Sequence, residues 1–77
     1  MTQYENLKSL QEAMSFPDVR FACKEVEILN EHFWKLMALS AAYDREEYVL
    51  IAKFDTLDEC KIWCDLHGIC LTDILSY

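Results

Sequence analysis

The chain of 77 residues has 14 acidic and 7 basic residues, a formal net charge of −7 at pH 7 and a hydrophobic content of 53%. A chain of this length forms one domain that buries only about 60–65% of the surface that its unfolded form exposes. We therefore expect a single compact domain over residues 1–77, with apolar surface left over for self-association into a homo-oligomer.

The acidic balance also restricts the partners. Nucleic acid and anionic membranes bind through clustered Lys and Arg, so the net charge disfavours both and favours a protein with a basic surface. The first residues have neither a basic start nor an apolar run, and no segment approaches the roughly 20 apolar residues of a membrane span. The expected location is cytoplasmic, where the four cysteines stay reduced.

The first predicted element is a helix over residues 3–14. Thr2, followed three residues later by Glu5, has the pattern of a capping box. Pro17 cannot continue a helix, so the helix is expected to end before it. Apolar residues recur at helical spacing within this range, at Tyr4, Leu7, Leu10 and Met14.

Residues 19–29 fit two patterns. Val19, Phe21 and Cys23 alternate as in a strand, but the apolar residues of this segment also fit one face of a helix. Residues 33–39 have helix-favouring Leu, Met and Ala, yet a polar turn and a strand-like segment follow them. A hairpin between residues 33–42 and 48–54 satisfies the backbone of both segments, since a single strand cannot satisfy its own.

The strongest local signal is in residues 48–68. Residues 48–54 read as a buried strand, and a helix follows them. Thr56 and Glu59 repeat the capping-box pattern at the start of this helix, and Gly68 suits the left-handed conformation that ends one.

These elements predict an α+β fold with an N-terminal helix, a three-stranded antiparallel meander and a C-terminal helix. The alternative makes residues 18–42 helical and gives a small all-α bundle.

Four potential metal ligands lie in and after the last helix. Cys60, Cys64, His67 and Cys70 are ligand types of tetrahedral zinc within eleven residues. However, Cys60 and His67 are about 10 Å apart along the axis of one helix, near the limit for sharing one ion. Buried core cysteines beside Trp63 are therefore favoured, and we expect neither a metal nor another cofactor. A metal- or thiol-dependent regulator centred on these four residues is the alternative function.

The expected partner-binding surface combines acidic and apolar residues. Ile62 and Leu66 lie on a different side of the last helix from its core residues. Of the adjacent Phe33 and Trp34, one enters the core and the other stays partly exposed, so Trp34 is a candidate binding aromatic. The densest carboxylates are those of Asp44, Glu46, Glu47, Asp55, Asp58 and Glu59.

No motif specifies a reaction, because one glycine excludes a Gly-rich phosphate loop and no sequence feature places a histidine beside a thiol. The sequence therefore indicates a non-enzymatic module that binds a basic partner protein, such as one that itself binds nucleic acid, as an inhibitor or adaptor. Small phage counter-defence proteins, including anti-CRISPR and anti-restriction inhibitors, are similar in kind: short, acidic, single-domain and without catalytic motifs. The likeness is one of type and rests on no shared motif.

Overall fold

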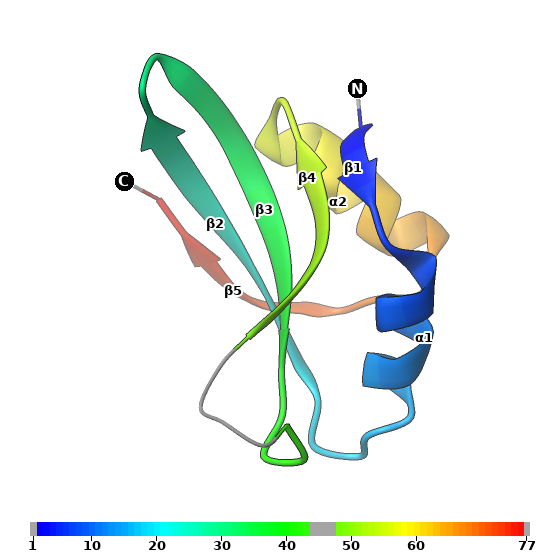
Figure 1. Cartoon of the computed structure of the whole chain (residues 1–77). Helices are drawn as coiled ribbons and strands as arrows, with labels where there is room; N and C mark the ends of the chain where they lie inside the picture. The colour runs from blue at the N-terminus through cyan, green and yellow to red at the C-terminus, as the bar shows by residue number, and fades with distance from the viewer. Residues whose placement is uncertain (1, 44–47, 77) are drawn as a thin grey trace.

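The computed structural model describes residues 2–43 and 48–76, and these form an α+β fold with two helices and a five-stranded mixed sheet (Figure 1). In chain order the elements are β1 (Thr2–Glu5), α1 (Leu7–Met14), β2 (Arg20–Ile28), β3 (Glu31–Leu39), β4 (Val49–Phe54), α2 (Leu57–Leu66) and β5 (Leu71–Leu75).

The sheet has the strand order β1-β4-β3-β2-β5. The three central strands β4, β3 and β2 are antiparallel neighbours, and β1 adds to β4 in the antiparallel sense. Because β2 and β4 are both antiparallel to β3, they run in the same direction. The helix α2 carries the chain across from β4 to β5, which then pairs with β2 in parallel. The first and last described strands therefore form the two edges of the sheet.

The hydrophobic core lies between the two helices and one face of the sheet. Leu36 and Ala38 of β3 point to this face and are fully buried, as is Cys23 of the neighbouring strand. The helices contribute Leu10 and Ala13 from α1 and Cys60, Trp63 and Cys64 from α2. The opposite face of the sheet has no helix over it within the described ranges.

The hairpin between β2 and β3 is the longest regular feature. The two strands pair over nine residues without a register shift, from Arg20 opposite Leu39 to Ile28 opposite Glu31. Leu29 and Asn30 turn the chain with φ values of 49° and 70°. Two successive left-handed residues match the twist of a two-residue hairpin, but leucine is a strained choice there.

Both predicted folds are wrong. The sheet has five strands rather than three, and residues 18–42 are not helical, which excludes the all-α bundle. Two short segments account for the difference. Residues 2–5 form β1 and satisfy the outer edge of β4, and residues 71–75 form β5 and satisfy the outer edge of β2.

The predicted start of the first helix is also wrong. Asn6, not Thr2, is the N-cap, and its Oδ1 accepts a hydrogen bond from the Ser9 amide at 3.0 Å. The apolar spacing of Leu7 and Leu10 holds equally for the shorter helix, so the periodicity could not place its start.

The last helix begins and ends as predicted. Thr56 Oγ1 accepts a hydrogen bond from the Glu59 amide at 3.2 Å, and Gly68 has a φ of 69°. Neither described helix combines the length and the apolar content needed to cross a membrane.

We expect Leu36→Ala to lower the free energy of unfolding by about 2–5 kcal/mol, because it leaves a cavity in the centre of the core. The matched change Leu29→Ala, at a side chain that is 90% exposed, should stay within about 0.5 kcal/mol. Urea denaturation followed by tryptophan fluorescence measures both. Equal losses in the two variants would contradict a core on the helix side of β3.

Candidate functional site

The outer face of α2, formed by Asp58, Ile62, Asp65 and Leu66, is the first candidate site. The opposite side of this helix is anchored in the core, with Trp63 6% exposed and Cys60 fully buried. Ile62 is 59% exposed and Leu66 is 78% exposed. These residues are one helical turn apart, so they form a continuous apolar pair on the surface.

The chain that follows α2 leaves this pair uncovered. The Ile69 amide donates to the Cys64 carbonyl at 2.8 Å, which closes the helix end at the left-handed Gly68. The chain then runs to the edge of the sheet, where Thr72 Oγ1 donates to the Phe21 carbonyl at 3.0 Å. The tail thus becomes strand β5 and does not fold back over Ile62 and Leu66.

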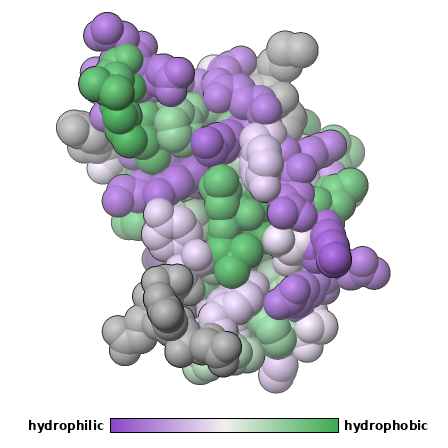
Figure 2. Space-filling view, viewed as in Figure 1, coloured by the Kyte–Doolittle hydropathy of each residue, from purple (hydrophilic) through white to green (hydrophobic). Residues whose placement is uncertain are grey.

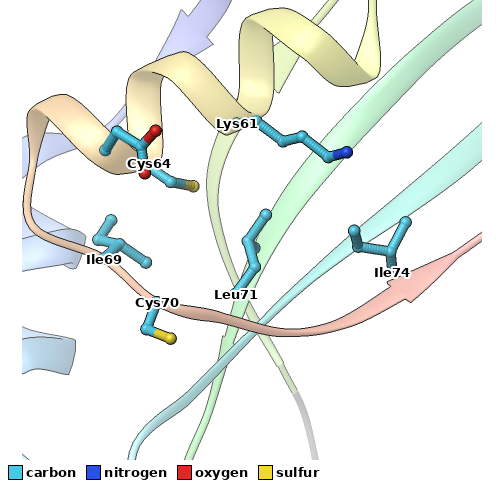
Figure 3. A pocket seen from close by; sticks show the side chains of 7 residues that line it. Lys61, Cys64, Ile69, Cys70, Leu71 and Ile74 are labelled. Carbon is cyan, nitrogen blue, oxygen red and sulfur yellow. The ribbon is translucent and has the colours of Figure 1, made fainter.

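A shallow hollow of about 350 Å³ lies beside this face, between α2 and β5 (Figure 3). Leu71 and Ile74 point into it from the strand, and Lys61 extends over it from the helix. Its other lining residues are Cys64, Asp65, Ile69 and Cys70. The hollow has an apolar floor with one charge of each sign at its rim, which suits a protruding apolar side chain.

Carboxylates surround the start of α2. Asp58 is exposed and Glu59 is half-buried, both in the first turn, where the helix dipole favours negative charge. Asp55 is exposed, and its Oδ1 accepts a hydrogen bond from Gln3, which lowers the pKa of this carboxyl. The remaining predicted acidic residues, Asp44, Glu46 and Glu47, lie outside the described residues.

Trp34 is not part of an exposed surface. It is 8% exposed and belongs to the core, where its β-sheet partner is Phe54. The adjacent Phe33 is the half-buried residue of the pair and points to the uncovered face of the sheet.

The structure separates the predicted zinc ligands. Cys60 and Cys64 are buried, Cys70 is exposed, and all are free thiols. The buried pair joins Cys23 of β2, which sequence spacing could not bring near. Hydrogen bonds between Cys60 and these two thiols, together with burial, raise the pKa of Cys60 far above its usual value.

His67 is held by Trp63 instead of by the thiols. The two rings stack with centroids 3.9 Å apart, and His67 Nδ1 lies 2.8 Å from the Trp63 carbonyl oxygen. Trp63 Nε1 donates in turn to Glu5 Oε2 at 2.9 Å, which ties α2 to β1. Among the residues that the structure describes, no group of three His, Cys, Asp or Glu side chains is arranged to hold a metal ion.

A second surface was missed by the sequence reasoning. Lys24, Lys35 and Lys53 are far apart in the chain, but the strand register places them opposite one another. Only the pairing of the strands reveals this group, because no local run of basic residues signals it.

Comparisons with protein-family models, with curated proteins and with solved structures find no match for this chain.

We expect Ellman's reagent to modify one thiol rapidly in the folded protein and the other three only on unfolding, because Cys70 alone among the four is exposed. Cys70→Ser should abolish the rapid reaction, whereas Cys60→Ala should leave it and cost on the order of 1 kcal/mol of stability through lost packing. Rapid reaction of two or more thiols, or stoichiometric zinc in the purified protein, would contradict this assignment.

Proposed function

We propose that this protein acts by binding another protein through the outer face of α2, as an inhibitor or an adaptor rather than as an enzyme. The observation that carries the proposal is the exposure of Ile62 and Leu66, at 59% and 78%, on a helix whose other side is fixed in the core. A rigid helix that presents an apolar pair at i and i+4 has the geometry by which helices dock on apolar grooves.

The charges beside this pair favour a partner with a basic rim. Asp58 lies one turn before Ile62, and Asp65 lies next to Leu66. Charges at the rim of an interface mainly accelerate the encounter and select the partner, whereas the buried apolar centre supplies most of the affinity. Ile62 and Leu66 are therefore the expected affinity determinants, and the carboxylates the expected determinants of salt dependence.

We expect the double variant Ile62→Ser, Leu66→Ser to lose retained partner protein by about tenfold or more, because both affinity determinants are removed. The wild type and the variant are immobilised, exposed to an extract of the source cells, and compared by quantitative mass spectrometry. The retained protein should have a basic surface and should elute as salt rises from roughly 50 to 300 mM.

The matched control is Leu7→Ser, Met14→Ser, which removes two comparably exposed apolar side chains, at 51% and 49%, from α1. This control should retain the partner as the wild type does. Equal retention by all three proteins, or equal loss in both variants, would contradict binding through α2.

A further inference from the structure

Three lysines form one row across the middle of the sheet. Lys24 of β2 lies directly opposite Lys35 of β3, and Lys35 lies directly opposite Lys53 of β4. Directly paired residues point to the same face, and strands are about 4.8 Å apart, so the row is about 10 Å long. The alternate residues of β3, Trp34 and Leu36, point into the core. The lysine row therefore lies on the face that the helices leave uncovered.

Aromatic groups hold two of these lysines. Lys35 Nζ donates to Tyr48 Oη at 2.7 Å and lies 4.3 Å from the centre of the same ring. Lys53 Nζ lies 5.0 Å from the centre of the Phe33 ring. Cation–π contacts orient an ammonium without neutralising it. No carboxylate in the described ranges forms an ion pair with any lysine of the row.

Two lysines of the row lower the pKa of the neighbouring Tyr48. The hydrogen bond from Lys35, and then the charge of Lys35, lower the pKa of this phenol, and the charge of Lys24 acts in the same direction. The strand register thus gathers three positive charges on one face of a chain whose net charge is −7.

Stability alone does not explain the row. Like charges directly opposite one another destabilise a sheet, and this chain has only seven basic residues. The described carboxylates on the same face, Glu31 and Asp73, are paired with Ile28 and Ala22 and lie outside the row. An anionic ligand bound across the three lysines would relieve this repulsion.

Exposed apolar residues flank the row. Leu75 pairs with Lys24 at the edge of the sheet and is 48% exposed, and Ile28 at the far end of β2 is 55% exposed. Leu29 at the tip of the hairpin is 90% exposed in a left-handed conformation that leucine seldom adopts. In Figure 1 β1 and β4 pass in front of α2, and Figure 2 shows, in the same view, hydrophobic residues next to hydrophilic ones.

We propose that this face, with the lysine row at its centre, binds an acidic, amphipathic segment of a partner protein. Carboxylates of the segment pair with Lys24, Lys35 and Lys53, and its apolar side chains contact Ile28 and Leu75. This surface is distinct from the outer face of α2, so its partner and its test are independent of the function proposed above.

The charges and the rings select this occupant over two others. A second copy packed symmetrically on the same face would bring two lysine rows together, which like-charge repulsion opposes. A nucleic-acid strand would need open ring faces for base stacking, but the rings of Phe33 and Tyr48 carry the lysine ammonium groups.

The probe is a fluorescein-labelled peptide of repeated Glu-Glu-Leu triplets, and fluorescence anisotropy measures its binding at low ionic strength. We expect saturable binding that the triple variant Lys24→Gln, Lys35→Gln, Lys53→Gln weakens by about tenfold or more. The control Lys8→Gln, Lys61→Gln removes exposed lysines from the two helices and should bind as the wild type does. A Lys-Lys-Leu peptide should not bind.

A second variant separates binding from folding. Lys24→Glu creates an opposite-charge pair with Lys35, so it should raise the melting temperature of the free protein while it weakens peptide binding. A lower melting temperature would show that Lys24 has a structural role instead. Absence of saturable peptide binding, equal loss in the Lys8 and Lys61 control, or tighter binding of oligo(dT) than of the peptide would each overturn the proposal.

Discussion

The main core cluster of this protein lies on one side of the sheet, and the rest of the structure depends on that constraint. The helices have only eight and ten residues, and both pack on the same face of the five-stranded sheet. Each strand therefore divides its side chains between a dry face and a face without a helix. Leu36 and Lys35, adjacent in β3, show the division most clearly, since one is fully buried and the other carries a charge across the sheet.

The one-sided core also separates the charges of the molecule. The start of α2 is acidic, whereas the uncovered face of the sheet has three lysines in a row. A net charge of −7 averages over these two regions and describes neither. The composition argues against anionic partners only if the lysines are dispersed over the surface. The strand register instead places three of them in one row. Two proposed surfaces on opposite sides would let the protein contact two partners at once.

Sequence reasoning succeeded where local chemistry decides the structure. The cap at Thr56, the stop at Gly68 and the burial of Cys60 beside Trp63 follow from short-range patterns. It failed where pairing between distant segments decides. Residues 2–5 match a capping box, but strand β4 offers them an open edge, and tertiary pairing overrides the local pattern. Of the candidate site, the exposure of Ile62 and Leu66 was predictable from helical spacing, whereas the lysine row required the register.

Both outer strands are joined to distant parts of the chain. Gln3 of β1 bonds Asp55, which is 52 residues later, and Thr72 of β5 bonds Phe21, which is 51 residues earlier. The ends of such long loops must come together before these contacts can form, which slows folding. Until then the edges of the strands remain unpaired. During synthesis, β2 has no lasting neighbour on its outer side until residue 75 has left the ribosome. The nascent chain is therefore exposed to edge-to-edge aggregation until β5 is added.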